Sequence, residues 1–377
     1  MNLRQSDYLL SILAHRSRGL MRHLGGVESR WLGRKLQSIE LNAPVFLTGL
    51  ARSGTTILLE ELARFPGVAT HRYRDFPFLM TPVFWNRFTS RFAAKQEPVE
   101  RPHKDRIRIT AESPEAFEEP IWQFFFPEAH SPTSLHRLGA DVKNEEFESF
   151  FRDHIRKVLL LRSGRRYLSK ENYNVSRIEY LGRIFPDSRF LIPVRHPVDH
   201  VHSLVRQHRL FCDYDRQDRR VRSYLAMAGH YEFGPQRCPI RLDGDSGDRA
   251  FAAWQKGADY RGYAIQWAAI YRLIHQLCSR EDGLSRRILV VRYEDFCATP
   301  HEVMRRILAH IDLPPRALPP DACSHISPPE RSSEPASDSQ KEIWQETRDC
   351  AACFGYVPSN GPHMPAFTGS RVQSTRL

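Results

Sequence analysis

The chain has 377 residues, a formal net charge of +11 and an isoelectric point near 9.5. This length allows a large core, in one α/β domain with extensions or in two domains. The excess of arginine suits polyanionic ligands, although a solvated basic surface explains the same charge. Seven scattered cysteines argue against a disulfide framework, and no segment resembles a signal peptide or reaches transmembrane length, so we expect a reduced, cytoplasmic protein.

Residues 1–40 form the first predicted element, a helical extension in which leucines alternate with arginines. This pattern is typical of an amphipathic helix. Such a helix packs on its own domain, joins two subunits or lies on a membrane surface. We favour packing on the domain or a homodimer through these helices over peripheral membrane contact.

The stretch from Ala43 to Arg64 predicts a strand, a tight turn and a helix. Val45 to Thr48 is a short apolar run, Gly49 to Gly54 is a glycine-bounded turn, and Thr55 to Arg64 has the apolar face of a helix. Backbone N–H groups and the positive end of the helix dipole meet at such a turn. The stretch therefore predicts a site for phosphate or sulfate.

The glycine spacing of this turn matches a Walker A loop, but the lysine of that motif is absent. Thr55 stands in its place, followed by Thr56, and the positive charge lies earlier, at Arg52. A turn that binds nothing would explain the glycines alone, but not their coincidence with an arginine and two hydroxyls. We predict an anion-binding loop that differs from the phosphate loop of ATPases.

The rest of the chain holds an aromatic-rich region followed by further strands. Residues 66–165 show no obvious parallel strand, so we expect helices and long loops that shape an acceptor pocket. Strand-like runs follow at 166–170, 189–195 and 287–292, separated by helical patterns as β–α–β crossovers require. Residues 205–260 resemble an insertion or lid.

These elements predict an α/β fold of three layers, in which helices flank a central parallel sheet. The core domain is expected over 41–315, with 66–165 and 205–260 as the insertions that form the acceptor pocket or a lid. Residues 316–377 are expected to form a linker and a C-terminal helix, at about 339–353, that docks back on the domain.

Positive side chains lie at the predicted carboxyl ends of the strands, where open parallel sheets bind their ligands. Lys170, Arg195 and Arg292 each end a strand, and Arg52 lies in the loop after the first strand. Such a site neutralises its ligand with side-chain cations, so we expect no metal requirement. This arrangement suits an anionic nucleotide and the transfer of a sulfuryl group.

A second anion site is indicated by Arg195 and Ser203, which are separated by seven residues. Arg195 ends a strand, Pro197 suits the first turn of a helix, and Ser203 falls in the second turn. A surface ion pair and an exposed serine would explain this pair alone. Its combination with the loop at Arg52 favours a ligand with two separate anionic groups.

Together these motifs resemble those of the sulfotransferases that use 3′-phosphoadenosine 5′-phosphosulfate (PAPS) as donor. The stretch Gly49-Leu-Ala-Arg-Ser-Gly-Thr-Thr56 resembles their 5′-phosphosulfate loop, and Arg195 with Ser203 resembles their 3′-phosphate site. The resemblance spans about Pro44 to Leu313 and also covers Lys170-Glu-Asn-Tyr and Arg292-Tyr-Glu-Asp-Phe296.

The resemblance implies a P-loop-like sulfotransferase domain in which an acceptor hydroxyl or amine attacks the sulfur of PAPS in line. It implies that Arg52 and Lys170 stabilise the charge that develops on the leaving phosphate. The donor-binding residues that it implies are Arg52, Ser53, Gly54, Thr55 and Thr56 for the 5′-phosphate, Arg195 and Ser203 for the 3′-phosphate, and Tyr293 near the adenine.

A general base is needed to take the proton of the acceptor. Relatives with a glutamate base carry it about twenty residues beyond the loop, and the carboxylate nearest to that position is Asp75. Two flanking arginines would weaken Asp75 as a base, and an ordinary ion pair explains it equally well. His103 is the second candidate, and Glu112 or Glu118 is the third.

Two other functions stay open at this point. A kinase with a degenerate loop would bind ATP with Mg²⁺, but the chain lacks the Walker lysine and a strand-end aspartate. A non-catalytic basic module would bind acidic lipid or nucleic acid, but no zinc-finger, helix-turn-helix or RNA-binding signature supports it, so we expect no nucleic-acid partner. The acceptor is expected to be a small molecule or lipid, and the aromatic-rich region favours an apolar alcohol or phenol.

Overall fold

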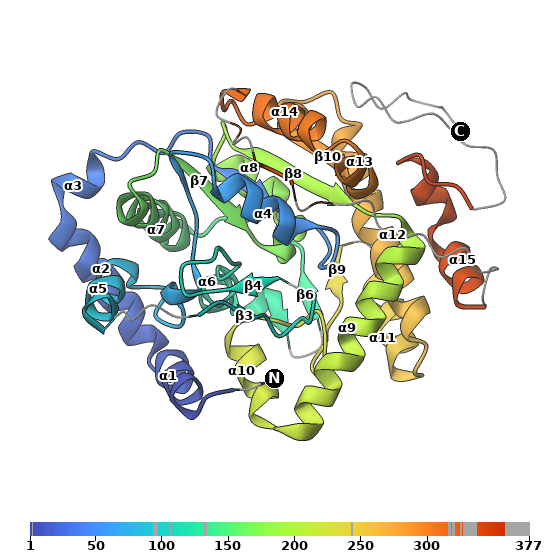
Figure 1. Cartoon of the computed structure of the whole chain (residues 1–377), viewed down its shortest axis with the longest axis horizontal. Helices are drawn as coiled ribbons and strands as arrows, with labels where there is room; N and C mark the ends of the chain where they lie inside the picture. Colours follow the sequence, from blue (N-terminus) through green and yellow to red (C-terminus); the bar gives the residue numbers. More distant parts are fainter. Residues whose placement is uncertain are drawn as a thin grey trace.

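A sheet of five parallel strands, in the order β10–β8–β1–β7–β2, forms the centre of the molecule (Figure 1). The computed structural model describes residues 1, 3–92, 97–105, 107–131, 134–242, 244–315, 318, 321–324, 326 and 338–358. The strands of the sheet are β1 (Val45–Leu47), β2 (Val68–Ala69), β7 (Arg166–Lys170), β8 (Arg189–Val194) and β10 (Ile288–Arg292).

Four of these strands lie where the sequence predicts them. The fifth, β2, pairs in parallel with β7 through Val68 and Ala69. The expectation that 66–165 contains no parallel strand is therefore wrong at β2, and wrong again at β6 (Ser134–His136), which pairs in parallel with β9 (Ile240–Arg241). A strand of two residues is too short to show an alternating pattern, so its sequence carried no signal.

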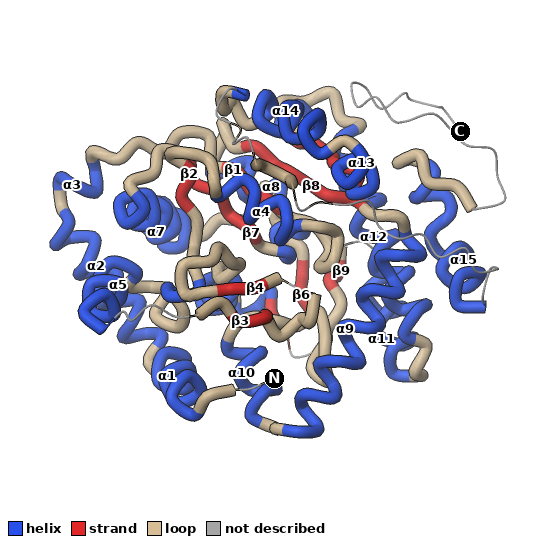
Figure 2. The backbone as a smooth tube through the Cα atoms, viewed as in Figure 1, coloured by secondary structure: helices blue, strands red, loops and turns tan. Residues whose placement is uncertain are grey.

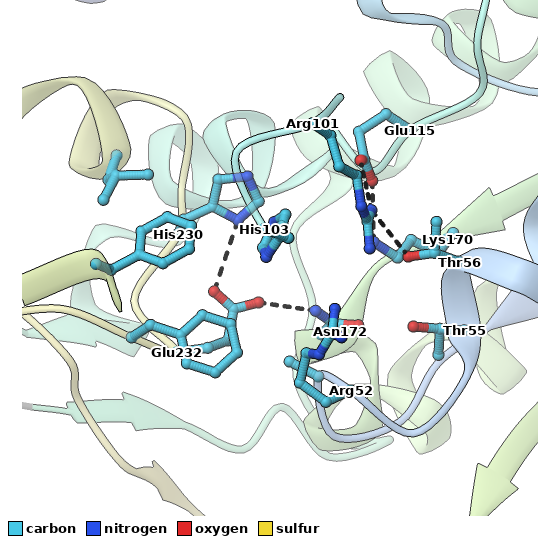
Figure 3. A pocket seen from close by; sticks show the side chains of 14 residues that line it. Arg52, Thr55, Thr56, Arg101, His103, Glu115, Lys170, Asn172, His230 and Glu232 are labelled. Atoms are coloured by element: carbon cyan, nitrogen blue, oxygen red, sulfur yellow. Dashed lines mark hydrogen bonds and ion pairs between the residues drawn. The ribbon is translucent and has the colours of Figure 1, made fainter. Parts of the chain in front are cut away.

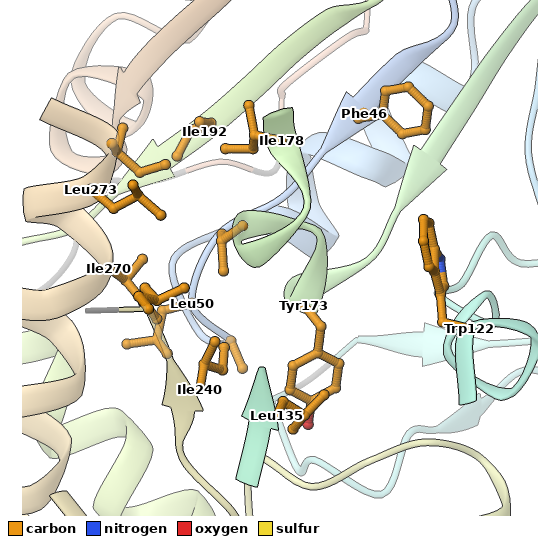
Figure 4. Close-up of a cluster of buried hydrophobic side chains, with 14 of the residues drawn as sticks. Phe46, Leu50, Trp122, Leu135, Tyr173, Ile178, Ile192, Ile240, Ile270 and Leu273 are labelled. Carbon is orange, nitrogen blue, oxygen red and sulfur yellow. The ribbon is translucent and has the colours of Figure 1, made fainter. Parts of the chain in front are cut away.

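Side chains that alternate across β1 divide the core between the two faces of the sheet. Val45 and Leu47 belong to the apolar cluster on one face, and Phe46 belongs to the cluster on the other. Phe46 lies opposite Phe190 of β8, with the ring centroids 5.5 Å apart (Figure 4 shows Phe46 beside this core). The prediction of a central parallel sheet between two helical layers is confirmed, as Figure 2 shows.

Helices cover both faces and supply the two clusters with apolar side chains. The face of Val45 is covered by α4 (Thr55–Ala63), α13 (Tyr293–Ala298) and α14 (Pro300–His310). The face of Phe46 is covered by α6 (Glu119–Phe125), α7 (Glu145–Arg162), α8 (Ile178–Ile184), α9 (Pro197–Gln217) and α12 (Asp259–Cys278), and the apolar cluster on this face extends to α15 (Asp338–Ala352). Of these, α15 packs against α9 and α12.

The N-terminal extension consists of α1 (Gln5–Arg16), α2 (Arg18–Leu32) and α3 (Arg34–Gln37), and it packs on the domain. Lys157 of α7 lies 3.1 Å from the carboxylate of Glu28 and donates to the carbonyl of Gly25 at 2.7 Å. A Cβ at Gly25 would lie 2.5 Å from the carbonyl oxygen of Met80, so glycine permits this close approach. The buried pair and the close approach fix α2 to the domain.

The remaining elements are short. A hairpin of β3 (Val99–Glu100) and β4 (Arg108–Ile109) lies near the carboxyl edge of the main sheet, and β5 (His130–Ser131), β6 (Ser134–His136) and β9 (Ile240–Arg241) form a third sheet. The other helices are α5 (Pro82–Thr89), α10 (Arg220–Met227) and α11 (Ser246–Gln255). Most of the predicted 316–337 linker lies outside the described residues. Within the described part of the chain, no helix has the length and apolar character needed to span a membrane.

Candidate functional site

The loop between β1 and α4 contains two residues with left-handed backbone, Arg52 (φ 71°) and Gly54 (φ 104°). Gly54 allows a close contact, because a Cβ there would lie 2.6 Å from Cδ2 of Tyr293. A non-glycine residue with this backbone is strained, and such strain persists where the surroundings fix it. The contacts of Arg52 with neighbouring elements hold its backbone in this conformation.

Arg52 joins the two predicted anion motifs. Its Nε donates to Oγ of Ser203 at 3.4 Å, and its carbonyl oxygen accepts from Nη1 of Arg195 at 3.4 Å. The guanidinium of Arg195 lies 5.0 Å from the ring centroid of Tyr293, and its Nε is buried with no hydrogen-bond partner among the described residues. The structure thus brings Arg52, Arg195, Ser203 and Tyr293 together at one end of the sheet.

A pocket of about 500 Å³ opens beside this loop (Figure 3). Its polar side is lined by Arg52, Thr55 and Thr56 of the loop and α4, Arg101 of the hairpin, Glu115, and Lys170 and Asn172 at the end of β7. Its other side is lined by Ala51, His103, Phe211, Leu225, His230, Glu232 and Phe233. The pocket therefore combines a cationic side with a side on which apolar side chains alternate with two histidines and a carboxylate.

Lys170 reaches this pocket, as the sequence predicts, and is paired there. Its Nζ donates to Oε1 of Glu115 at 3.0 Å, and Glu115 also accepts from the hydroxyl of Tyr73 at 2.7 Å. Burial alone would raise the pKa of Glu115, but Lys170 and Arg101 outweigh burial and hold that pKa below its usual value. Glu115 is therefore ionised and holds the ammonium group of Lys170 in place.

Arg292 is the strand-end cation that points elsewhere. Its guanidinium lies 4.6 Å from the ring centroid of Tyr356, and its Nη1 lies 3.8 Å from the carboxylate of Asp295. Arg52 and Lys170 line the pocket, and Arg195 lies outside its lining but contacts Arg52. Arg292 does neither, so the prediction that all four strand-end cations converge is wrong for Arg292.

The structure contradicts the prediction that Asp75 is the catalytic base. Asp75 does not line the pocket and is 1% exposed, and its carboxylate accepts from Nη2 of Arg162 at 2.5 and 2.8 Å and from Nδ2 of Asn86 at 2.8 Å. Burial alone would raise its pKa, but His71 and Arg162 outweigh burial and hold that pKa well below its usual value. Asp75 is a buried structural anion.

The third candidates fail for similar reasons. Glu112 accepts from Nη1 of Arg72 at 2.5 Å and from Nη1 of Arg74 at 2.6 Å in an exposed ion pair. Glu118 is buried and accepts from the hydroxyl of Tyr167. Neither carboxylate lines the pocket. Arg72 and Arg74, which precede Asp75 in the sequence, thus form ion pairs with Glu112.

Replacement of Asp75 by asparagine is expected to lower the free energy of unfolding by about 1–3 kcal/mol at pH 7, because Arg162 loses its buried counter-charge. The depressed pKa of Asp75 means that its stabilisation is present above the unfolded-state pKa of about 3.9 and is lost as pH falls through the folded-state pKa. The difference between wild type and variant should therefore shrink below about pH 4. Denaturant unfolding measures it, with the exposed Glu112→Gln as control.

His103 is the predicted base candidate that the structure places in the pocket. Its ring centroid lies 5.2 Å from that of Phe211, and its Nδ1 is buried with no hydrogen-bond partner among the described residues. Burial, Arg101 and Arg52 hold the pKa of His103 well below its usual value. The imidazole is therefore neutral at pH 7, and the same environment makes it a weaker base than a free histidine while no anion is bound.

The sequence analysis missed a second histidine in the pocket and its carboxylate partner. Oε1 of Glu232 accepts from Nδ2 of Asn172 at 2.8 Å, and Oε2 lies 3.6 Å from Nδ1 of His230. Burial alone would raise the pKa of Glu232, but His230 and Asn172 outweigh it and lower that pKa to about 2. Asn172 could have been found from its position two residues after the strand-end Lys170. Nothing in the local sequence marks His230 or Glu232.

Arg101 and Asp105, on either side of His103, were not predicted. Residues 101–105 form a turn in which Lys104 has left-handed backbone (φ 49°), so the local sequence has no alternating pattern that would have marked these two neighbours of His103.

Comparison with known proteins agrees with this geometry. A family model described as "Sulfotransferase family" matches residues 44–238. Similar solved structures are sulfotransferase STF9 from Mycobacterium avium (16% identity, 93% of this chain and 84% of that chain, TM-score 0.51), sulfotransferase STF1 from Mycobacterium tuberculosis H37Rv (12%, 86% and 77%, 0.42) and a sulfotransferase from Alicyclobacillus acidocaldarius (14%, 83% and 94%, 0.41). No curated protein sequence matches the chain. At 16% identity, the structural similarity to STF9 is evidence for the fold of this chain alone.

Proposed function

The chain belongs to the sulfotransferase family, and we propose that it transfers a sulfuryl group from PAPS to a hydroxyl or amine of a small-molecule or lipid acceptor with an apolar body. Family membership supports sulfuryl transfer in general. The identity of the donor, the class of acceptor and the roles of individual residues are the content of the proposal.

The contact of Arg52 with both Ser203 and Arg195 carries the proposal. PAPS has two separate anionic groups, the 5′-phosphosulfate and the 3′-phosphate. Arg52 lies in the loop at the start of α4. Its Nε lies 3.4 Å from Oγ of Ser203 on α9, and its carbonyl oxygen lies 3.4 Å from Nη1 of Arg195 at the end of β8. Two adjacent anion sites of this kind suit one ligand that bridges them.

The residues present fit the 3′-phosphate. The buried Nε of Arg195 lacks a hydrogen-bond partner among the described residues, so it retains a donor for a phosphate oxygen. The hydroxyl of the buried Ser203, which accepts from Nε of Arg52 at 3.4 Å, offers a second donor. Tyr293 supports the guanidinium of Arg195 from its ring face, which is the role we propose for Tyr293 in addition to contact with the adenine.

When bound, PAPS supplies an activated sulfuryl group on a phosphate leaving group. We assign to Arg52 and Lys170 the stabilisation of the charge that develops on that phosphate, together with the backbone N–H groups from Ser53 to Thr56. His103 takes the proton of the acceptor as the new bond to sulfur forms. Side-chain cations carry out the neutralisation, without a metal.

The apolar side of the pocket indicates the acceptor. Phe211, Leu225 and Phe233 would surround the body of the acceptor and keep water from the reacting atoms, while its hydroxyl faces His103. The paired His230 and Glu232 lie at the border and offer one polar contact to an additional group of the acceptor. An apolar alcohol or a phenol fits these surroundings better than a sugar with many hydroxyls.

The test is sulfation by the purified full-length chain with PAPS, EDTA and a panel of phenols, long-chain alcohols, amines and sugars. We expect release of 3′-phosphoadenosine 5′-phosphate (PAP) and a sulfated product with the phenols or alcohols. Phosphorylation of the same panel with ATP and Mg²⁺, without any sulfation, would contradict the proposal and favour a kinase.

A further inference from the structure

The β3–β4 hairpin brings three chemically active side chains to the anion-binding loop. Arg101 and His103 line the pocket, and Asp105 reaches the loop itself. The tip of the hairpin is held on α9, where Tyr214 donates to the carbonyl of Pro102 at 2.9 Å and Gln207 donates to the carbonyl of His103 at 3.3 Å.

The carboxylate of Asp105 lies between two arginines. Oδ2 accepts from Nη1 of Arg52 at 2.7 Å and from Nη2 of Arg101 at 2.5 Å, and Oδ1 accepts from Nε of Arg101 at 2.9 Å. Burial alone would raise the pKa of Asp105, but Arg101 and Arg52 outweigh it and hold that pKa well below its usual value. The ionised carboxylate of Asp105 therefore pairs with Arg52, the side chain that the loop would direct at a bound anion.

Arg101 is placed to act on the same anion. Its side chain is 4% exposed, and Nη1 donates to Oγ1 of Thr56 at 3.3 Å and lies 3.5 Å from Oε2 of Glu115. Its guanidinium thus spans the region between the start of α4 and the Glu115–Lys170 pair. This is the side of the loop that faces the pocket (Figure 3).

We propose that Arg101 is a further donor-binding residue and that the carboxylate of Asp105 stands in for the phosphosulfate group until the donor binds. This inference rests on the proposed function. Donor binding exchanges one anion for another: the phosphosulfate oxygens take over the N–H groups of Arg52 and Arg101 that Asp105 holds. Asp105 competes with the donor, because two anions at one pair of arginines repel each other.

The exchange explains why a carboxylate lies in an anion site. The buried guanidinium of Arg101 beside the half-buried guanidinium of Arg52 is unfavourable without a counter-charge, since the desolvation of these cations is uncompensated. Asp105 supplies that counter-charge in the free protein and keeps both side chains ordered. Because Asp105 occupies both arginines, the loop should bind any other anion with a lower affinity, which can be measured.

The test is the affinity of the full-length chain for two probes, PAP and inorganic pyrophosphate, which resembles the phosphosulfate in carrying two linked anionic groups. Asp105→Asn keeps the shape of the side chain and removes its charge. We expect it to bind both probes roughly tenfold more tightly than wild type in calorimetry, the order of change expected when a competing charge at a partly buried site is removed.

Two variants make the result specific. Glu97→Gln removes one negative charge from the exposed start of the same segment and should leave both affinities unchanged. Arg101→Gln combined with Asp105→Asn should lose most of the gain, because one of the two freed arginines is gone. If Asp105→Asn is poorly folded by circular dichroism, Asp105→Ser must show the same gain.

Equal or weaker binding of pyrophosphate by the folded Asp105 variants would overturn the inference, because Asp105 would then only position the arginines. Failure of the wild type to bind PAP would instead count against the proposed function. The two failures are distinguishable, since the pyrophosphate comparison does not depend on recognition of the nucleotide.

Discussion

Replacement of His103 by glutamine is expected to lower kcat by about 10²–10⁴-fold, the usual contribution of a positioned general base. Glutamine retains a polar side chain of similar reach but cannot take a proton from the acceptor. The affinity for PAP should change little, because His103 lies on the acceptor side of the pocket. Steady-state kinetics with the acceptor found by the sulfation panel, together with calorimetry of PAP, separates the two effects.

The role of His103 as a base also predicts how the rate changes with pH. His103 acts in its neutral form, so the rate should fall as pH falls through its pKa. In the free protein that pKa is held well below its usual value by burial, Arg101 and Arg52. The negative charges of a bound donor offset the two arginines and raise the pKa. With PAPS as the varied substrate, the acid limb of kcat should therefore lie at higher pH than the acid limb of kcat/KM for PAPS.

Two further histidines test the specificity of the result. His23, an exposed residue of α2, is the matched control, and His23→Gln should retain the wild-type kcat. His230→Gln addresses the other histidine of the pocket. Loss of turnover and of the acid limb in His230→Gln, with full activity in His103→Gln, would move the base to the His230–Glu232 pair.

Replacement of Arg195 by alanine is expected to weaken PAP binding by about 2–4 kcal/mol, as the loss of a buried charge-assisted contact does. Binding of AMP, which lacks the 3′-phosphate, should change little. The reason is the geometry of Arg195, whose unpartnered Nε and neighbouring Ser203 hydroxyl form the second anion site. Calorimetry with both nucleotides measures the difference.

Arg189 offers a matched control at the opposite end of the same strand. It pairs with Asp312 at 2.8 Å and has a side chain that is 27% exposed. Arg189→Ala removes the same charge from the protein and should leave the affinity for both nucleotides unchanged. An equal loss of AMP and PAP affinity in Arg195→Ala would show that Arg195 supports the loop rather than the 3′-phosphate.

The juxtaposition of Arg52, Arg195 and Ser203 could be predicted from the sequence because its signals are local. The glycines and Arg52 lie within one short loop, and the spacing of Arg195 and Ser203 follows from one strand end and one helix. The meeting of these motifs also followed from the topology, since the carboxyl ends of parallel strands share one edge of the sheet.

The acceptor side could not be predicted, because its residues come together only in the folded chain. Asp75 has two arginines beside it in the sequence, yet its partner is Arg162, 87 residues away. His230 and Glu232 lie on a loop after α10 whose placement depends on packing between distant helices. Charge and distance along the chain were therefore poor guides to the base, whereas burial and pairing exclude Asp75 directly.

We propose above all that the loop at Arg52 and the adjoining Arg195 and Ser203 bind one nucleotide with phosphate groups at both the 5′ and 3′ positions. The most direct test of this proposal is calorimetry of the wild-type chain with PAP and with AMP, both in the presence of EDTA. The account predicts that PAP binds without a divalent metal and much more tightly than AMP. Equal affinities for the two nucleotides, or binding that appears only with ATP and Mg²⁺, would contradict it.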